Sequence, residues 1–231
     1  MGTGDHRADE VAHAVILNGF LIDQTEVTNG QYAHCVDEGV CQPPVRLDSY
    51  SHREYFGNPQ FDDYPVIYVT WNDADTFCRW DARRLPTEAE WERAARGSDE
   101  RIYPWGDQAP QPALLNYDFD VGDTSPVGRY PLDASPYHVL DMAGNVSEWV
   151  SDWYSAGYYA SSASSDPGGP LATQARVVRG GSWFDNRYGV RSALRRFYPP
   201  DSAFVNLGFR CAVSTSAPPT FMMGASGFTR R

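Results

Sequence analysis

Lysine is absent from this sequence of 231 residues, and long apolar runs are absent as well. All 19 basic side chains are arginine, which excludes Schiff-base catalysis by lysine and a phosphate-binding P-loop. The longest apolar runs, such as 14–17 and 65–69, are far shorter than the roughly 20 residues that cross a bilayer, so we expect no membrane span. The five histidines show no HxxxH or HxH spacing, which argues against a zinc or iron site.

The charge balance is acidic, with 30 Asp and Glu side chains and a net charge of -11. Nucleic acid would repel such a chain, so we expect no nucleic-acid partner. Aromatic residues make up 14%, with 20 Gly and 17 Pro, a composition typical of irregular folds with long packed loops. We find no internal repeat and no linker, and predict a monomer with one domain over 1–213 and a low-complexity tail over 214–231.

Helical signals occur in three segments, 29–37, 71–80 and 84–96. The last is the clearest, because Thr87 and Glu90 have the spacing of a capping box and Gly97 supplies a stop. Alternation of apolar and polar residues predicts short strands within 14–28, and a Gly-rich strand pair is expected near 176–183.

Four motifs stand in order along the chain. They are IDQTEVTN at 22–29, RLPTEAEWE at 84–92, MAGNVSEW at 142–149, and RGGSW at 179–183 together with LGFRC at 207–211. Together they resemble the formylglycine-generating enzyme (sulfatase-modifying factor) family over about 15–213. The resemblance implies an α+β architecture, a variant of the C-type lectin fold with two main helices, short strands and extensive ordered loops.

The enzyme of that family uses copper held by two cysteines. The resemblance places the first of these cysteines at the position of Asp185, three residues after Ser182. It places the second at the position of Val190, or at that of Arg187 if the loop is shorter. A copper(I) site of this kind needs soft thiolates, which none of these residues supplies. We therefore expect no copper and no formylglycine-generating oxidase chemistry, so the chain is more consistent with a non-enzyme.

The four cysteines at 35, 41, 78 and 211 allow three pairings. The resemblance suggests that Cys78 pairs with Cys211, which leaves Cys35 for Cys41. Four reduced thiols in a cytosolic protein are the alternative. Disulfides would favour an extracytoplasmic or cell-surface location, although the first residues show no apolar run typical of a signal peptide.

Two acidic turns match structural calcium sites of the family. The first set of ligands implied by the resemblance comprises Asp141, the carbonyls of Gly144 and Val146, and Glu148. The second comprises Asn116, the carbonyl of Tyr117, and one of Asp118, Asp120 and Asp123, with Asp120 as our choice. Oxygen ligands around a glycine turn suit calcium. The alternative for the first turn is that Glu148 pairs with an arginine and Asp141 caps a turn; Arg191, Arg195 and Arg210 are expected to form buried ion pairs.

The segment 184–206 interleaves aromatic and small polar residues between fixed-looking anchors such as Trp183 and 208–210. Its candidate ligand-binding residues are Phe184, Asp185, Asn186, Tyr188, Leu194, Phe197, Tyr198, Ala203, Phe204 and Val205. Adaptable binding faces use this mixture, because it supplies contact area at low entropic cost. The layout also resembles the variable proteins of diversity-generating retroelements, and every candidate residue is encoded by some NNY codon, as such diversification produces.

The sequence therefore predicts a non-catalytic ligand-binding protein with a binding surface at about 184–206, which retroelement diversification would vary. The expected ligand is a protein or a cell-surface glycan. Two alternatives stay open, namely an enzyme of the family that uses oxidative chemistry without cysteine, and a sensor domain of a larger protein.

Overall fold

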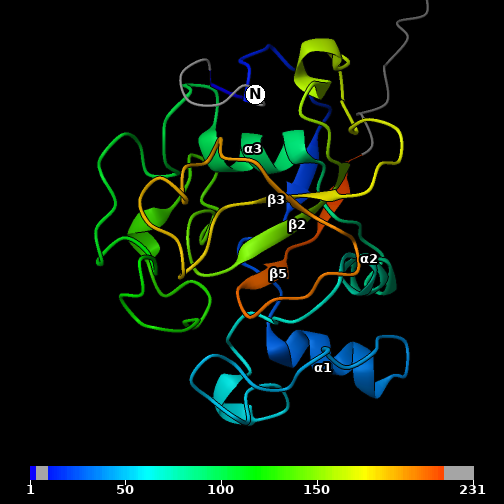
Figure 1. Ribbon diagram of the computed structural model, residues 1–231, viewed down its shortest axis with the longest axis vertical. Coiled ribbons are helices and arrows are strands. Elements are labelled where there is room, and N and C mark those ends of the chain that lie inside the picture. The colour runs from blue at the N-terminus through cyan, green and yellow to red at the C-terminus, as the bar shows by residue number, and fades with distance from the viewer. Residues whose placement is uncertain (4–9, 216–231) are drawn as a thin grey trace, which may run out of the picture.

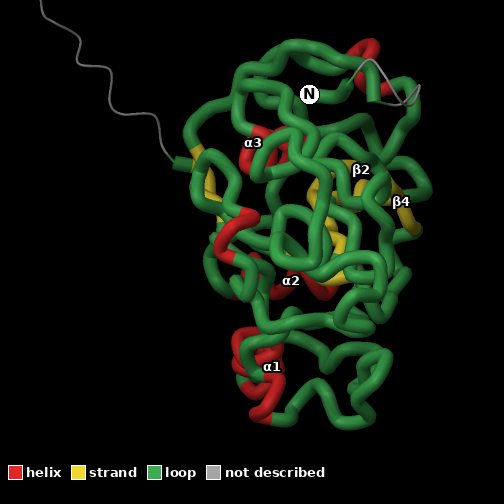
Figure 2. The backbone as a smooth tube through the Cα atoms, turned by 90° about the vertical axis from the view of Figure 1, so that its left-hand side faces the viewer, coloured by secondary structure: helices red, strands yellow, loops and turns green. Residues whose placement is uncertain are grey.

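Regular secondary structure is sparse in the computed structural model, which describes residues 1–3 and 10–215. The α-helices are α1 (Asn29–Asp37), α2 (Trp71–Trp80) and α3 (Glu88–Arg96), and the short 3-10 helices are η1 (Pro59–Phe61), η2 (Pro131–Asp133) and η3 (Tyr158–Ser161). The strands are β1 (Phe20–Ile22), β2 (Ser147–Trp153), β3 (Arg176–Arg179), β4 (Arg196–Tyr198), β5 (Leu207–Phe209) and β6 (Ala212–Ser214). Long ordered loops connect them (Figure 2). The architecture is α+β, with one α-helix more than the resemblance implied.

Each α-helix begins after a threonine. In all three, the threonine hydroxyl accepts the backbone N–H three residues on, and the side chain there accepts the threonine N–H in return. The pairs are Thr28 with Gln31, Thr70 with Asp73, and Thr87 with Glu90. The predicted capping box at Thr87 is confirmed, and α3 ends at Gly97, whose φ of 67° suits glycine.

The central sheet has four strands in the order β4-β3-β2-β5 (Figure 1). Strand β2 pairs antiparallel with β3 and parallel with β5, and β3 pairs antiparallel with β4. Only one strand, β3, forms where a strand pair was expected near 176–183, because the chain turns away at Gly180. Within 14–28 only β1 is a strand.

The sheet separates two parts of the core, and successive residues of a strand face opposite parts. On one face, Trp149 and Val178 pack with Phe77 of α2 and with residues of α1. On the other face, Val150 and Val177 pack with residues of α3. Figure 1 shows α3 above the sheet and α2 at its side. One sheet thus serves both groups of helices, which supports a single domain.

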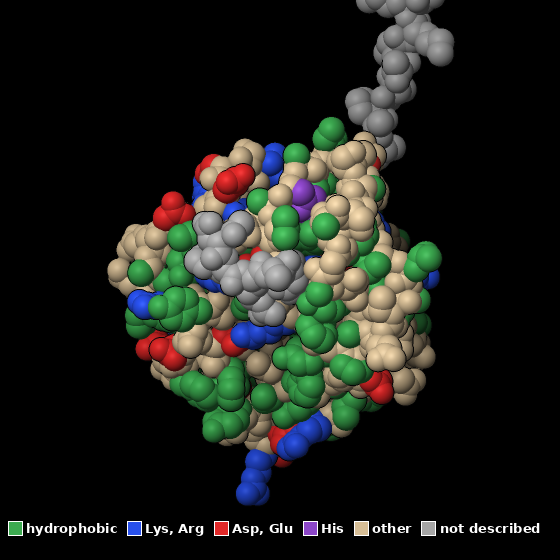
Figure 3. Space-filling model, turned by 45° about the horizontal axis from the view of Figure 1, so that its top comes forward, with side chains coloured by type: hydrophobic (Ala, Val, Ile, Leu, Met, Phe, Trp, Pro, Cys, Tyr) green, Lys and Arg blue, Asp and Glu red, His purple; other side chains and the backbone are tan. Residues whose placement is uncertain are grey.

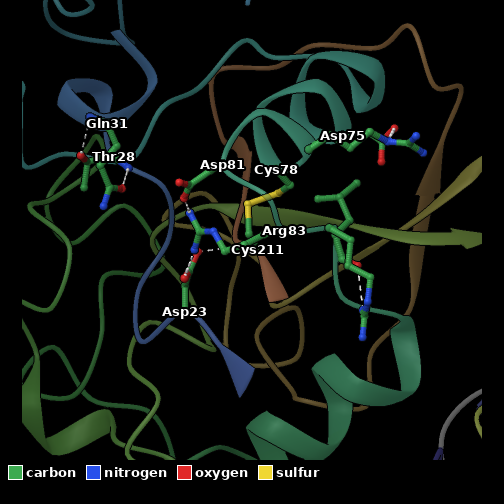
Figure 4. Close-up of a disulfide and its surroundings, with 11 residues drawn as sticks. Asp23, Thr28, Gln31, Asp75, Cys78, Asp81, Arg83 and Cys211 are labelled. Atoms are coloured by element: carbon green, nitrogen blue, oxygen red, sulfur yellow. Dashed lines mark hydrogen bonds and ion pairs between the residues drawn. A yellow bond between two sulfur atoms is a disulfide. The ribbon is translucent and has the colours of Figure 1, made fainter. Parts of the chain in front are cut away.

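Both disulfides suggested at the outset are present, namely Cys35–Cys41 and Cys78–Cys211. All four cysteines of the chain are bonded, so the alternative of reduced thiols is wrong. Figure 4 shows Cys78–Cys211 next to Arg83, which forms ion pairs with Asp23 and Asp81. The Cys78–Cys211 disulfide fixes the end of α2 to the segment between β5 and β6. Both disulfides favour an oxidising, extracytoplasmic environment.

Strand β6 pairs antiparallel with β1 and extends to Ser214, one residue beyond the predicted domain boundary. The remainder of the predicted tail, 216–231, lies outside the described residues. Within 1–3 and 10–215, no helix has the length and apolar character that a membrane crossing requires.

Candidate functional site

A glycine turn positions the start of the candidate binding segment. At Gly181, with a φ of 69°, an added Cβ would lie 2.3 Å from the carbonyl oxygen of Gly189. Only glycine therefore permits the two parts of the loop to approach so closely. The turn delivers Trp183 into the interior, where its ring is fully buried, and the next residue, Phe184, is exposed. Trp183, predicted as an anchor, is thus buried, and Phe184, predicted as a contact residue, is exposed.

Asp185 and Asn186 hold the loop together. The Asp185 carboxylate accepts from the Ser182 N–H and hydroxyl at 2.9 Å each and forms a bidentate ion pair with Arg196. The Asn186 side-chain oxygen accepts the backbone N–H groups of Tyr188 and Gly189. Both side chains are therefore engaged in internal bonds, in contrast to the free contact residues that the sequence predicted.

Exposed rings occupy the same segment. Phe184, Tyr188, Phe197 and Phe204 are each more than a third exposed, whereas Tyr198 is half-buried and packs edge-on against Phe204. Ala203 and Val205 are half-buried as well. Leu194 is buried, at 8% exposure, because the loop folds it beneath its neighbours. The side chains of this segment that a ligand can reach are therefore mainly the four exposed rings.

A shallow hollow of about 550 Å³ lies beside two of these rings, those of Phe184 and Tyr188, whereas Phe197 lines a separate hollow with Tyr154. The wall of the first hollow contains the candidate residues Phe184, Asp185, Asn186, Tyr188 and Leu194, with Asp118, Gly189, Arg191 and Arg196. The loops 98–136 and 180–195 meet here, since the backbone N–H groups of Asp118 and Phe119 donate to the carbonyls of Asp185 and Trp183. The hollow brings together five of the ten predicted contact residues.

Three aromatic residues next to this surface were missed by sequence reasoning. Tyr50 and Phe119 pack against Trp183 with centroids 5.3 Å away, and Tyr154 stacks on Phe197 at 3.9 Å. They come from parts of the chain distant in sequence, and no local pattern marks them. Asp118 and Asp120, the neighbours of Phe119, were noted only as calcium-loop candidates.

The positions that the resemblance assigns to catalytic cysteines hold other groups. Asp185 is ion-paired, Val190 is buried in an apolar cluster with Leu115, and Arg187 is exposed and donates to the Tyr188 hydroxyl. The chain has no free thiol at all, since both pairs of cysteines form disulfides. These side chains offer no soft ligand for copper(I).

The first predicted calcium turn lies in a buried cluster of carboxylates. Glu148 receives two bonds from Arg210, at 2.7 and 2.8 Å, and one from the Trp91 indole N–H at 2.9 Å. Asp141 accepts the Gly128 N–H at 2.6 Å. This is the alternative arrangement, with Glu148 paired to an arginine and Asp141 capping a turn. Within the described residues, no group of three or more acidic, His or Cys side chains is arranged to hold a metal ion.

The cluster nevertheless carries an excess of negative groups. Glu26 and Asp133 lie beside Asp141, and each has a buried carboxylate oxygen without a hydrogen-bond partner among the described residues. Burial, together with the Asp141 carboxylate, raises the pKa of Glu26 well above its ordinary value and that of Asp133 to about 8. Four carboxyl groups thus lie around the single guanidinium of Arg210, and a bound cation would favour their ionised forms.

The second predicted set is only partly assembled. Asn116 is buried and its side-chain oxygen has no partner among the described residues, which fits a missing cation ligand. Asp120 is exposed. Asp123 is buried, its carboxylate accepts from the Ser49 and Ser51 hydroxyls, and its backbone carbonyl accepts from the Asn116 side-chain amide at 2.7 Å.

The expected buried ion pairs of three arginines are confirmed. Arg191 pairs with Glu10, Arg195 with Glu88, and Arg210 with Glu148. The Arg195 and Arg210 pairs attach their segments to α3 and β2, and the Arg191 pair attaches the wall of the hollow to the N-terminal segment.

Comparison with known families now identifies the scaffold. The model of the sulfatase-modifying factor enzyme 1-like domain matches residues 1–215. The chain belongs to the sulfatase-modifying factor family. It is 43% identical to the formylglycine-generating enzyme of Streptomyces coelicolor, over 87% of this chain and 80% of that protein. It is also 37% identical to the serine/threonine-protein kinase Pkn1 of Chlamydia trachomatis, over 91% of this chain but only 36% of the kinase.

Two solved structures share the fold of this sulfatase-modifying factor domain. Treponema denticola variable protein 1 superposes with a TM-score of 0.75 at 25% identity, covering 93% of this chain and 91% of that one. PvdO from Pseudomonas aeruginosa superposes with a TM-score of 0.77 at 26% identity, covering 93% and 90%. The α+β fold is thus the C-type lectin-like variant of this family, as the motifs predicted, and its structural neighbours include a variable protein.

Proposed function

We propose that this domain is a non-catalytic ligand-binding protein, and that the surface around 184–206 contacts the ligand. The absence of any free thiol carries the proposal, because the family's copper chemistry depends on two of them. The exposed rings of Phe184, Tyr188, Phe197 and Phe204 on an otherwise tightly bonded loop support a recognition role. Figure 3 shows that exposed hydrophobic side chains gather in several groups on the face it presents.

The binding surface is tested by selecting peptides from a random display library on the immobilised protein. We expect the selected peptides to bind the wild type but not the variant Phe184→Ala/Tyr188→Ala/Phe204→Ala. The matched control removes three exposed hydrophobic side chains elsewhere, Ile16→Ala/Leu132→Ala/Leu171→Ala, and should bind as the wild type does. Equal binding by both triple variants would contradict the proposal.

The non-catalytic part of the proposal has its own test. The protein is incubated with copper, oxygen and a Cys-x-Pro-x-Arg peptide, and the peptide mass is followed. We expect no formylglycine, and any turnover above that of a copper-only control would show that the domain is an oxidase.

Retroelement diversification is the sharper form of the proposal. The similarity to Treponema denticola variable protein 1 supports it. Sequencing several alleles should reveal differences concentrated at the candidate residues of 184–206, with Trp183 and Gly208 constant. Differences spread evenly over the chain would contradict diversification without affecting ligand binding.

We also propose a structural calcium ion in the carboxylate cluster. Asp141 and Glu148, with the carbonyls of Gly144 and Val146, would hold it. The unpaired oxygens of the neighbouring Glu26 and Asp133 support a cation in this cluster, and Glu148 would share its carboxylate with Arg210. Calcium added to chelator-treated protein should raise the melting temperature, whereas magnesium should not, and Asp141→Ala, which removes the ligand oxygen, should remove the shift. No shift in the wild type would contradict the ion.

A further inference from the structure

Four aromatic side chains from three separate loops meet at one edge of the hollow. We call Tyr50, Phe119, Trp183 and Phe184 the aromatic corner. Phe119 lies 4.6 Å from Phe184 and 5.3 Å from Trp183, between ring centroids, and Tyr50 lies 5.3 Å from Trp183. Trp183 is buried beneath the other rings, whereas Tyr50, Phe119 and Phe184 are 63%, 44% and 51% exposed.

The backbone holds Phe119 outward in an unfavourable conformation. Asp118 and Phe119 have φ values of 50° and 60°, in the left-handed region that non-glycine residues rarely adopt. Two backbone bonds fix them there, from the Asp118 N–H to the Asp185 carbonyl and from the Phe119 N–H to the Trp183 carbonyl, each 2.9 Å long. Strain of this kind persists only where the surroundings impose it, and it is concentrated at functional sites.

The charge beside the aromatic corner is negative. Asp118 and Asp120 flank Phe119, are exposed, and have no ion-pair partner among the residues that the structure describes. The two arginines in the wall of the hollow are already neutralised, Arg196 by Asp185 and Arg191 by Glu10.

The exposed guanidinium of Arg187 lies next to the hollow and is engaged with a ring. Arg187 lies 4.7 Å from the centroid of the Tyr188 ring and donates to its hydroxyl. It offsets at most one of the two aspartates, so the hollow presents negative charge to an approaching ligand. The net charge of the whole chain, -11, acts in the same direction.

A buried donor completes the corner. The Trp183 Nε1–H has no hydrogen-bond partner within the described part of the chain, although its residue is fully buried. Buried donors are normally paired, so an unpaired one next to exposed rings points to an acceptor supplied by a ligand. A peptide carbonyl that displaces the Tyr50 ring from Trp183, while Phe119 and Phe184 stay in place, would supply it.

We infer that the aromatic corner binds an arginine or lysine side chain of a protein ligand. The faces of Phe119 and Phe184 attract the cation, and the carboxylates of Asp118 and Asp120 pair with it. Aromatic rings with adjacent carboxylates suit a cationic side chain, and the Trp183 N–H suits the ligand backbone. This inference rests on the proposed binding function and specifies the chemistry of its ligand.

The test uses four synthetic peptides, acetyl-Gly-Ser-X-Ser-Gly-amide with arginine, lysine, citrulline or glutamate at X, titrated into the protein and followed by NMR. We expect the arginine and lysine peptides to bind about fivefold or more tightly than the citrulline peptide, and the glutamate peptide not to bind. Equal affinity for arginine and citrulline, or no detectable binding of the arginine peptide, would overturn the inference. Displacement of the arginine peptide by the neutral sugar maltotriose would also overturn it, in favour of a glycan.

Variants locate the binding on the protein. Asp118→Asn/Asp120→Asn should reduce the affinity for the arginine peptide about fivefold, and Phe184→Ala should reduce it similarly. The matched control Asp37→Asn/Asp62→Asn removes the same charge from exposed residues at the end of α1 and after η1, and should leave the affinity unchanged. Equal losses in both aspartate pairs would mean that only the net charge matters, which would contradict the inference.

The two proposals fail in different ways. If library-selected peptides bind at the four exposed rings but lack a basic residue, the binding function stands and the cation inference is wrong. If those peptides bind the Phe184→Ala/Tyr188→Ala/Phe204→Ala variant as well as the wild type, the proposed binding surface itself is wrong.

Discussion

At the scale of single residues, buried charge dominates this protein. Arg210 is fully buried and donates to Glu148 and to four backbone carbonyls, those of Asp23, Gln24, Leu140 and Asp141. It ties β5 and the first motif to the turn before β2. Removing it would leave Glu148 as an unpaired buried carboxylate among further acids, which is the costly way to break an ion pair.

Replacing Arg210 with methionine should therefore lower the free energy of unfolding by about 3–5 kcal/mol. Urea denaturation followed by circular dichroism measures the change. The control is Arg79→Ala, which removes an exposed ion pair with Asp75 and should cost less than about 1 kcal/mol. Similar losses for the two variants would show that burial does not determine the strength of these pairs.

Asp152 gives the stability a defined pH dependence. Burial, aided by the Glu88 carboxylate, raises the pKa of Asp152 from 3.8 to about 7. Between pH 3.8 and about pH 7, the folded state therefore keeps a proton on Asp152 that the unfolded state releases. The stabilisation that this protonated carboxyl gives is complete below about pH 4 and is lost as the pH rises through about 7. We expect the free energy of unfolding to fall between pH 5 and pH 8.

Asp152→Asn should make that fall smaller, because asparagine still accepts the Glu88 N–H but does not ionise. Urea denaturation at several pH values measures it, with Asp37→Asn as the control for loss of an exposed carboxylate. An unchanged pH dependence in Asp152→Asn would assign the effect to other groups.

At the scale of elements, the two disulfides constrain loops of very different length. Cys78–Cys211 spans 133 residues and Cys35–Cys41 spans 6. In the chain-entropy model, the first stabilises by about 5 kcal/mol and the second by about 2 kcal/mol.

Cys78→Ala/Cys211→Ala should accordingly lower the urea midpoint much more than Cys35→Ala/Cys41→Ala. All four cysteines are buried, so both double variants leave similar cavities in the core. The difference between the two variants therefore reports the effect of loop length. A larger loss from the short loop would mean that packing around α1, and not chain entropy, sets the order.

Sequence reasoning located the helices better than the strands. A threonine with an acceptor three residues on is a local signal, and it correctly marks the start of α3 at Thr87. The strands β4, β5 and β6 have only three residues each and exist because distant partners pair with them, which no local pattern reveals.

The candidate site was predicted in part for the same reason. The rings within 184–206 follow one another in the chain, so their grouping was visible. The contribution of Phe119 was not, because it depends on two successive left-handed residues held by bonds to Trp183 and Asp185. Likewise, the engagement of Glu148 by Arg210 joins residues 62 positions apart, and the sequence left it as one of two alternatives.

At the scale of the whole molecule, both parts of the core share one sheet. Val177 and Val178 are adjacent in β3 but pack on opposite faces, with α3 and α2 respectively. Loss of either group of helices would expose the strands on which the other depends. The predicted single domain over 1–213 should thus unfold as one cooperative unit.

Calorimetry should show a single transition whose calorimetric enthalpy equals the van't Hoff enthalpy. The measurement uses the oxidised protein with and without calcium, so that ion binding is separated from domain structure. Two resolved transitions in both conditions would contradict one domain.

The pairing of β1 with β6 has a mechanical consequence. Phe20 lies opposite Ser214, so tension between these two points would unzip the ladder one pair at a time. The force would then pass through the disulfide between Cys211 and Cys78. The chain between them, residues 79–210, would not carry it. A force applied between Phe20 and Ser214 would therefore bypass the segment 184–206 along the covalent chain.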